Sequence, residues 1–536
     1  MLITSLLHRF GIHHVVVCPG SRNAPLVDAF ARCAPTYSVH PVTDERSAGF
    51  VAIGLAESLD APVAVCVTSG TAVANLYPAV IEAYHRNIPL VVISADRPME
   101  WIDQMDGQTM SQPGAYVRYA EYCDILPEND ESERLWYNNR ELNRILNYST
   151  HSHKPCHINI QLREPLFNFE NTEDLIDNNV RMVSSTPLVL PHTSLYADAM
   201  LAETIKSKWQ NSERIMIIVG QHKPDPHFAS LLARIKENSN AVILAESLSN
   251  LSSDIVSGSY NITPNDDTIA PDLLLYLGGH IVNKDLKLWL RKQPIPNVWQ
   301  LALHNYREMP DLFQQLSLQI YADSDVQLLE ALSTLVPSSS DANFVNSWQK
   351  RTYAATPIKP QQLIVNEFLS NAGLKNANLV LANSSSIRYA QKCTGFNAAD
   401  CAYVTCNRGV NGIEGTISQA VGVALANPDR LTVCLTGDLS FFYDHNALWN
   451  VNLPSNLRIL LINDGGGEIF KGLKGLELSP VRDSLVMASH NTSAEGWCRD
   501  CRVDYLASHL NDSQPSIEWL LAPSDRARVL EFTLWV

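Results

Sequence analysis

Two stretches decide the fold, Leu431-Thr-Val-Cys-Leu-Thr-Gly-Asp-Leu-Ser440 and Ile459-Leu-Leu-Ile-Asn-Asp-Gly-Gly-Gly467. Each begins with an apolar run, Leu431–Leu435 or Ile459–Ile462, and continues into glycines and an acid. Apolar runs bounded by turn residues indicate buried strands of a parallel sheet. The stretches therefore predict two neighbouring strands, each with a carboxylate at its carboxyl end.

The two acids, Asp438 and Asp464, predict a binding site for a cation and a phosphate. Mg²⁺ is usually held by one or two carboxylates together with the phosphates of a ligand. The neighbouring glycines allow the backbone to approach a bulky anion without a Cβ in the way. We interpret this pair as a magnesium-diphosphate site. The alternative is that both acids only cap helices, as strand-end acids do in any α/β domain.

Length, composition and charge narrow the class of protein. A chain of 536 residues is too long for one core and indicates about three domains. The hydrophobic content of 46% and charged content of 18% are typical of a globular protein. The net charge of −16 argues against a nucleic-acid or anionic-membrane partner. No apolar stretch reaches the roughly 18 residues that span a bilayer.

The cysteines and the N-terminal segment point to the cytoplasm. The eleven cysteines are scattered, which favours free thiols in a reducing compartment. Cys498 and Cys501 form the only CxxC pair, without a second pair at zinc spacing, so we interpret them as structural thiols. Met1–Phe10 has no basic leader and is expected to form a helix.

Alternation of strand-length and helix-length segments predicts an α/β fold with doubly wound parallel sheets. We expect domains at residues 1–175, 190–340 and 355–536, with a linker over Asn171–Ser194 and a boundary at Pro337–Asp341. Phe441–Val451 and Val73–Tyr84 are expected to be helical. The expected strands are Val15–Val17, Pro62–Thr68, Leu90–Ser94, His157–Gln161, Ile215–Val219, Ala241–Leu244, Leu273–Leu277, Leu379–Leu381, Leu431–Leu435, Ile459–Ile462 and Arg528–Phe532. None of the expected central strands is followed by a GxGxxG loop, so nothing indicates a dinucleotide there.

The two acidic stretches also resemble the thiamine-diphosphate motif, which begins Gly-Asp-Gly and ends in Asn about one βαβ crossover later. Two positions depart from that pattern: Leu439 stands where Gly is usual, and Asp464 stands where Asn is usual. Aspartate still offers an oxygen ligand, so the second departure changes the charge and keeps the chemistry.

Blocks along nearly the whole chain resemble one family within this superfamily, the menaquinone-pathway synthases that form 2-succinyl-5-enolpyruvyl-6-hydroxy-3-cyclohexene-1-carboxylate. The matching blocks are Pro19–Arg22, Asp44–Arg46, Thr68–Pro78, Ala95–Pro98, Gln112–Gly114, Asn383-Ser384 with Arg388, Asn407–Gly409, Gly412–Gly415 and Gly437–Ser440. The resemblance implies three doubly wound domains of the thiamine-diphosphate decarboxylase and synthase type: pyrimidine-binding, central and diphosphate-binding. It also implies a transferase that decarboxylates 2-oxoglutarate and adds the resulting four-carbon carbanion to isochorismate.

The resemblance assigns roles around the cofactor. Glu45 would hydrogen-bond the aminopyrimidine ring, and Ile413 would hold the cofactor in its bent shape. Asp438, Asp464 and the carbonyl of Gly466 would hold Mg²⁺ or Mn²⁺, with Asn463 a weaker candidate. The further cofactor-binding positions are Ser384, Gly437, Asp438, Leu439 and Ser440.

Both implied substrates are dicarboxylates, which require fixed cations, preferably arginine. The resemblance places Ser384, Arg388 and Arg408 at the donor-derived group, and Arg97, Gln108 and Lys284 at the acceptor. Ser21 and Arg22 complete the substrate-binding set, and Glu45, Gln108, Arg388 and Arg408 are the catalytic candidates. Where the family often has Lys-Arg, this chain has Lys284-Asp285, and Lys287 is an alternative second cation.

The expected assembly is a homodimer or a dimer of dimers, because in this superfamily the cofactor lies between the first domain of one subunit and the third domain of another. Two alternatives stay open. One is another thiamine-diphosphate 2-oxoacid decarboxylase or an acetohydroxyacid-type synthase. The other is a cofactor-binding remnant with a regulatory role.

Overall fold

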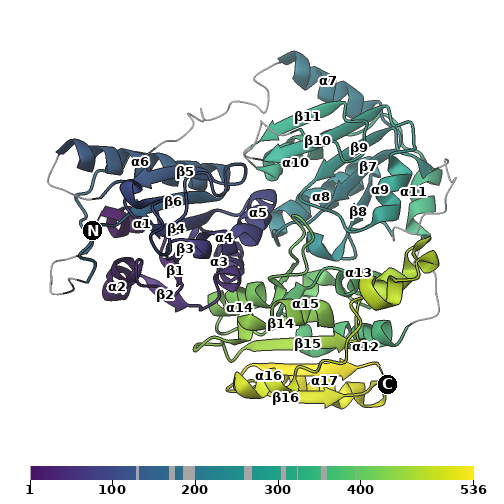
Figure 1. Cartoon of the computed structure of the whole chain (residues 1–536). Coiled ribbons are helices and arrows are strands. Elements are labelled where there is room, and N and C mark those ends of the chain that lie inside the picture. Colours follow the sequence, from purple (N-terminus) through teal and green to yellow (C-terminus); the bar gives the residue numbers. More distant parts are fainter. Residues whose placement is uncertain are drawn as a thin grey trace. The chain divides into compact units, whose positions relative to one another are not determined.

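The structure is a computed structural model that describes residues 2–127, 132–167, 169, 175–184, 199–258, 269–303, 309–322, 324–351, 359–393 and 395–535. The chain divides into two compact units (Figure 1). One comprises Met1–Thr186, Val380–Ser385 and Cys406–Val536, and the other comprises Pro187–Leu379 and Ser386–Thr405. Most of the expected linker, at 171–174 and 185–194, lies outside the described residues, and the three domain boundaries stay predictions.

The first sheet is fully parallel, with strand order β2-β1-β3-β4-β6-β5. Successive residues of its strands face two different cores, as expected for a doubly wound sheet. The strands are β1 (His14–Val17), β2 (Ser38–Pro41), β3 (Val63–Val67), β4 (Leu90–Asp96), β5 (Glu121–Ile125) and β6 (Cys156–Gln161). The helices are α1 (Leu2–Arg9), α2 (Ala24–Arg32), α3 (Glu45–Leu59), α4 (Thr71–Asn75), α5 (Tyr77–Arg86) and α6 (Ser132–Ser152).

The second sheet, in the second unit, is also parallel, with order β11-β10-β9-β7-β8. Its strands are β7 (Ile215–Val219), β8 (Val242–Ala245), β9 (Leu273–Leu277), β10 (Asn297–Leu303) and β11 (Leu318–Ala322). The helices of this unit are α7 (Ala199–Gln210), α8 (Pro226–Ser239), α9 (Lys284–Leu290), α10 (Asp325–Ser333), α11 (Ala342–Gln349), α12 (Pro360–Leu369) and α13 (Ser385–Lys392).

The third sheet has order β13-β12-β14-β15-β17-β16, and its last four strands pair in parallel. Its strands are β12 (Asn378–Leu381), β13 (Tyr403–Thr405), β14 (Thr432–Gly437), β15 (Leu457–Asn463), β16 (Asp504–Ser508) and β17 (Arg528–Thr533). The helices that follow in the chain are α14 (Thr416–Ala426), α15 (Asp438–Tyr443), α16 (Glu495–Asp500) and α17 (Ser513–Leu521). The predicted fold class, with doubly wound parallel sheets, is confirmed.

Two expected helices differ from the structure. The helix predicted over Phe441–Val451 is wrong as one element, because α15 ends at Tyr443 and a 3₁₀ turn follows over His445–Leu448. The buried carboxylate of Asp444 accepts hydrogen bonds from the backbone N–H and the hydroxyl of Ser418, which takes the chain out of the helix. The helix predicted over Val73–Tyr84 is divided at Leu76 into α4 and α5.

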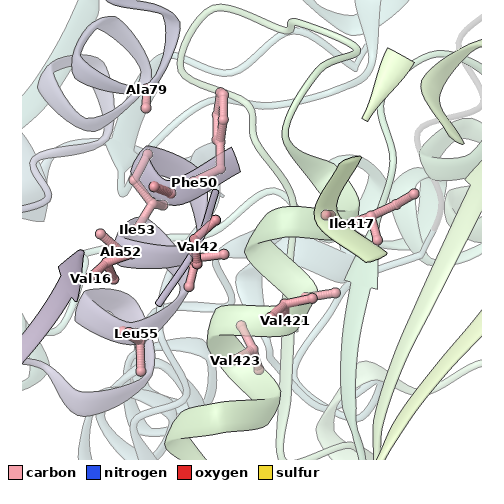
Figure 2. Close-up of a cluster of buried hydrophobic side chains, with 14 of the residues drawn as sticks. Val16, Val42, Phe50, Ala52, Ile53, Leu55, Ala79, Ile417, Val421 and Val423 are labelled. Atoms are coloured by element: carbon pink, nitrogen blue, oxygen red, sulfur yellow. The ribbon is translucent and has the colours of Figure 1, made fainter. Parts of the chain in front are cut away.

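Helices α3 and α14 join the first and third sheets of the first unit in one apolar core. Figure 2 shows Phe50, Ile53 and Leu55 of α3 beside Ile417 and Val421 of α14. The two helices meet at glycines. A Cβ on Gly54 would lie 2.2 Å from the carbonyl oxygen of Gln419, and one on Gly422 would lie 2.1 Å from that of Val51.

We expect Gly422→Ala to destabilise this unit by about 1–3 kcal/mol, because the added methyl group meets backbone that cannot turn away. The measurement is the unfolding midpoint in denaturant. Gly472→Ala is the matched control, because a Cβ there meets nothing within 4 Å. Equal midpoints for the two variants would contradict the close helix contact.

No helix of the described residues combines the length and apolar character needed to cross a bilayer. All eleven cysteines are unpaired and ten are buried, including Cys498, while Cys501 is half-buried. The expected free thiols are therefore present.

Candidate active site

Asp438 is the buried centre of the site. Strand β14 ends at Gly437, and Asp438 is the first residue of α15, with 3% of its surface exposed. Its Oδ1 accepts a hydrogen bond from the N–H of Leu439 at 2.6 Å, and its Oδ2 accepts one from the N–H of Gly466 at 2.9 Å. This carboxylate therefore joins the ends of the two strands whose acids the sequence singled out.

The loop after β15 supplies the other predicted metal ligands. Asp464 is half-buried, and the carbonyl of Gly466 accepts a hydrogen bond from the N–H of Glu468 at 3.0 Å. Gly466 has φ +146°, and a Cβ there would lie 2.8 Å from the carbonyl oxygen of Met487, so only glycine fits this turn.

Asn463 is held inside the protein. Its amide donates to Glu531 Oε1 at 2.5 Å and to the carbonyl of Thr492 at 2.8 Å, and its Oδ1 accepts from the indole N–H of Trp535 at 2.9 Å. Because these bonds engage both ends of the amide, Asn463 supports the loop, and Asp464 is the better metal candidate.

His490 is a neighbour of Asp438 that no sequence motif indicated. Its Nδ1 accepts a hydrogen bond from the N–H of Thr492 at 3.1 Å, so the ring proton lies on Nε2, which is 3.4 Å from Asp438 Oδ2. Burial raises the pKa of Asp438, while the N–H groups of Gly466 and Leu439 and the imidazole of His490 oppose that rise.

Glu45 begins α3 and is half-buried. Its Oε2 accepts a hydrogen bond from Asn75 Nδ2 at 3.0 Å. The preceding acid, Asp44, caps the helix by accepting from the N–H of Ser47 at 3.1 Å, and it also accepts from Asn446 Nδ2 at 2.7 Å. The start of α3 is therefore fixed to the segment that follows α15.

The loop before α14 contacts both α15 and α3. The carbonyl of Ile413, a half-buried residue, accepts a hydrogen bond from the hydroxyl of Ser440 at 2.6 Å. Gly415 has φ +79°, and a Cβ there would lie 2.2 Å from the ring of Phe50. The structure thus brings Ile413 and Ser440 together and packs their loop against the helix that carries Glu45.

Three of the predicted arginines are engaged in hydrogen bonds of the first unit. Arg408 is 5% exposed, and its Nη1 donates to Asn383 Oδ1 at 2.9 Å. Arg22 donates to the carbonyl of Leu162 at 2.8 Å and to Glu164 at 3.2 Å, and burial lowers its pKa. Arg97 pairs with Asp106 at 2.9 Å and lies 3.8 Å from the same Glu164 oxygen. Glu164, which no sequence pattern indicated, therefore brings Arg22 and Arg97 together.

The remaining predicted residues lie at the surface of their units. Ser21 and Gln108 are exposed; Gln108 has φ +58°, and its carbonyl accepts from the hydroxyl of Ser69 at 2.9 Å. Ser384, half-buried with φ +70°, directly precedes α13. Lys284 and Arg388 are exposed and belong to the second unit, so their placement beside the other site residues stays a prediction. Lys287 donates to the carbonyl of Ile281 at 3.1 Å and is thereby tied to its own unit.

A buried hydrogen-bond network lies behind Arg97. Asp96 Oδ1 accepts from the N–H of Arg97 at 2.8 Å, and Asp96 Oδ2 accepts from Asn159 Nδ2 at 2.9 Å. Gln112 donates to Asn159 Oδ1 at 2.7 Å and accepts from the N–H of Gly70 at 2.9 Å. The network therefore fixes the two turns that follow the carboxyl ends of β3 and β4.

His157, in the same network, makes this region sensitive to acid. Its Nε2 lies 2.7 Å from Ser94 Oγ, and its buried Nδ1 has no partner among the described residues. Burial lowers its pKa from 6.5 to about 3, because the imidazolium would be an unpaired buried charge.

The imidazole of His157 therefore binds a proton at a lower pH in the folded state than in the unfolded chain. The stability contributed by neutral His157 is lost as the pH falls from 6.5 to about 3. The expected loss is about 1.4 kcal/mol per pH unit in that window. We expect His157→Gln to lack this acid-dependent loss of stability. The difference in unfolding free energy between wild type and variant should therefore shrink on acidification. A difference independent of pH would contradict this account.

Comparison with known proteins places the chain in a class. Residues 1–115 match the family described as thiamine pyrophosphate enzyme, N-terminal TPP binding domain. The fold matches that of benzoylformate decarboxylase from Polynucleobacter necessarius, with a TM-score of 0.72 over 99% of this chain and 98% of that one, at 17% identity. The family model indicates a thiamine-pyrophosphate-dependent enzyme, and the structural match shows a shared fold.

Relatives of nearly full length define the family. A 2-succinyl-5-enolpyruvyl-6-hydroxy-3-cyclohexene-1-carboxylate synthase of Bacteroides thetaiotaomicron is 40% identical over 93% of this chain and 88% of its own. Synthases of the same name from Desulfotalea psychrophila and Cytophaga hutchinsonii are 36% and 34% identical, over 91% and 99% of this chain and 90% and 94% of their own. The chain belongs to this synthase family, and the resemblance found in the sequence is confirmed.

Proposed function

We propose that this chain decarboxylates 2-oxoglutarate on thiamine diphosphate and joins the remaining four-carbon unit to isochorismate, as a transferase of menaquinone biosynthesis. The observation that carries the proposal is the identity of 33–40% to synthases of that name over nine-tenths of the chain or more. When bound, thiamine diphosphate supplies the electron sink that stabilises the charge left by decarboxylation.

The residues at the ends of β14 and β15 fit a divalent cation with a diphosphate. The oxygens of Asp438 accept backbone hydrogen bonds from Leu439 and Gly466, and a carboxylate, with about four lone-pair sites, can still bind a metal. A Cβ on Gly437 would meet only the carbonyl oxygen of Ile462, 4.0 Å away, so packing within the protein does not require glycine there. We infer that Asp438, Asp464 and the Gly466 carbonyl hold Mg²⁺ or Mn²⁺, while Gly437, Leu439, Ser440 and Ser384 contact the cofactor.

Glu45 and Ile413 would act on the rest of the cofactor. The carboxyl of Glu45 would hydrogen-bond N1′ of the pyrimidine and hold a proton there, and Ile413 would support the bent shape. Both residues belong to the unit that contains Asp438.

The arginines fit substrates that carry two carboxylates. Arg22 and Arg97 both lie near the exposed carboxylate of Glu164, a group that a substrate carboxylate can replace. We infer that Arg408, Arg388 and Ser384 hold the donor-derived group. Arg97, Gln108 and Lys284 would hold the acceptor, and Ser21 and Arg22 would complete the set.

We also propose a cytoplasmic homodimer, or a dimer of dimers. Val451, Leu478 and Leu485 are large apolar side chains exposed on the first unit, where a second subunit could cover them. Light scattering of the purified protein would give the mass of the assembly.

The function is tested by incubating purified protein, thiamine diphosphate and Mg²⁺ with 2-oxoglutarate and isochorismate, and in parallel with pyruvate alone. We expect carbon dioxide release from 2-oxoglutarate together with the isochorismate-derived product. Consumption of pyruvate alone would establish the alternative, a different 2-oxoacid decarboxylase or acetohydroxyacid-type synthase.

A further inference from the structure

Two side chains of α5 hold the residues on either side of Arg408. Glu82 Oε1 accepts a hydrogen bond from the N–H of Gly409 at 2.8 Å, and Glu82 Oε2 accepts one from the N–H of Val410 at 2.9 Å. Arg86 Nη1 donates to Asn407 Oδ1 at 3.1 Å. The backbone around Arg408 is thus fixed by a helix that lies more than 300 positions earlier in the chain.

The contact between α5 and this loop is close. A Cβ on Gly409 would lie 2.9 Å from Glu82 Oε2 and 3.0 Å from both the carbonyl oxygen of Glu82 and the Cβ of His85. A side chain at position 409 would push the loop away from the helix. Gly409 therefore allows both carboxylate oxygens of Glu82 to reach backbone N–H groups.

The charged groups behind the loop are buried, with two carboxylates around one guanidinium. Glu82 is 1% exposed, and Arg86 pairs with Glu57 and lies 3.8 Å from Glu82. The second oxygen of Glu57 accepts from Gln419 Nε2 at 2.7 Å. Burial raises the pKa of Glu82, and Arg86 and the two N–H groups oppose that rise. Removing Arg86 would leave two buried carboxylates without their counter-charge, so its position between Glu57 and Glu82 allows little movement.

Two buried donors beside this network have no partner among the described residues. They are the Nε of Arg408 and the Nδ2 of Asn407. The bond from Arg86 fixes the Oδ1 side of Asn407 and leaves its NH₂ group as the unused end. Buried donors normally find an acceptor, and a carboxylate, which has two acceptor oxygens, suits a pair of donors of which one is charged.

We infer that Glu82 and Arg86 are positioning residues: they orient the Arg408 guanidinium and the Asn407 amide toward a carboxylate of the donor substrate. Through these two groups they set the preference for a dicarboxylic 2-oxoacid. This inference rests on the proposed function and adds residues that do not themselves touch the substrate.

The test variant is Glu82→Gln, whose amide accepts from only one of the two N–H groups and opposes the other with its own N–H. The readout is selectivity, the ratio of kcat/KM for 2-oxoglutarate to that for 2-oxopentanoate, which has the same carbon chain without the distal carboxylate. We expect this ratio to fall about tenfold, while KM for isochorismate changes less than about twofold. Arg86→Lys should lower the ratio in the same direction, because lysine cannot hold Glu57 and Asn407 together.

Asn456→Ala is the control for a loss of stability alone. Its amide holds the carbonyls of Ala424, Asn427 and Arg430 in the same unit, at 3.2, 2.8 and 2.7 Å. We expect this variant to unfold more easily with unchanged selectivity. Equal losses of kcat/KM for both oxoacids in Glu82→Gln and Arg86→Lys would overturn this inference and leave the proposed function standing. A wild-type protein that does not process 2-oxoglutarate would overturn the proposed function as well.

Discussion

Glu45→Gln should lower turnover by about 10²- to 10⁴-fold while the fold stays intact. The amide can still accept the hydrogen bond from Asn75, so the start of α3 keeps its contacts. It cannot hold or release the proton at the pyrimidine nitrogen, which is the role proposed for Glu45. The measurement is the steady-state rate at saturating cofactor and substrates, alongside the thermal unfolding midpoint.

Asp44→Asn is the matched control, because it removes one negative charge from the same helix start. Asparagine is as good an N-cap as aspartate, so α3 should still form. We expect this control to keep its rate within about tenfold of wild type. If Glu45→Gln retained the wild-type rate, or if both variants lost the same activity, the role of Glu45 would be disproved.

Asp438→Asn should weaken binding of the metal and the diphosphate together. The amide can replace one of the two acceptor bonds to Leu439 and Gly466, but it loses the charge that faces the cation. Replacing even the outer partners of metal ligands lowers affinity by about 10- to 100-fold, so losing a ligand charge should exceed that range. The measurement is the Mg²⁺ concentration that restores half of the activity.

Asp464→Asn provides the comparison. An amide oxygen is also a magnesium ligand, so we expect a loss of less than about tenfold in this variant. Removing the metal with a chelator should abolish activity in wild type, and added Mg²⁺ or Mn²⁺ should restore it. An unchanged Mg²⁺ requirement in Asp438→Asn would contradict a metal-binding role for Asp438.

The fully buried strands could be predicted from the sequence, whereas the edge strands of the first sheet and the partly buried inner strand β10 could not. Val63–Val67 is buried throughout and is a continuous apolar run, and the equally buried Leu457–Asn463 contains the apolar run Ile459–Ile462. Ser38–Pro41 and Glu121–Ile125 form the edges of the first sheet, where one side meets another segment or solvent, and polar residues interrupt the apolar residues of both. Edge positions do not require apolar side chains, so the pattern carries no signal there.

The same limit applies to the site. Asp438 and Asp464 stood out because each follows a buried strand, and the remaining site residues came from the resemblance of whole blocks to a family. No local sequence pattern indicates His490, Glu164 or Arg86, because each contacts residues that are far away in the chain. Such contacts exist only once the fold has brought distant segments together.

The proposed function depends on binding of thiamine diphosphate at the ends of β14 and β15 through a divalent cation. Its most direct test is calorimetric titration of the cofactor into metal-free protein, with and without Mg²⁺, for wild type and Asp438→Asn. We expect saturable heat for wild type only when Mg²⁺ is present, and a much weaker response in Asp438→Asn. Absence of binding heat in wild type with Mg²⁺, or identical titrations for the two proteins, would contradict this mode of binding.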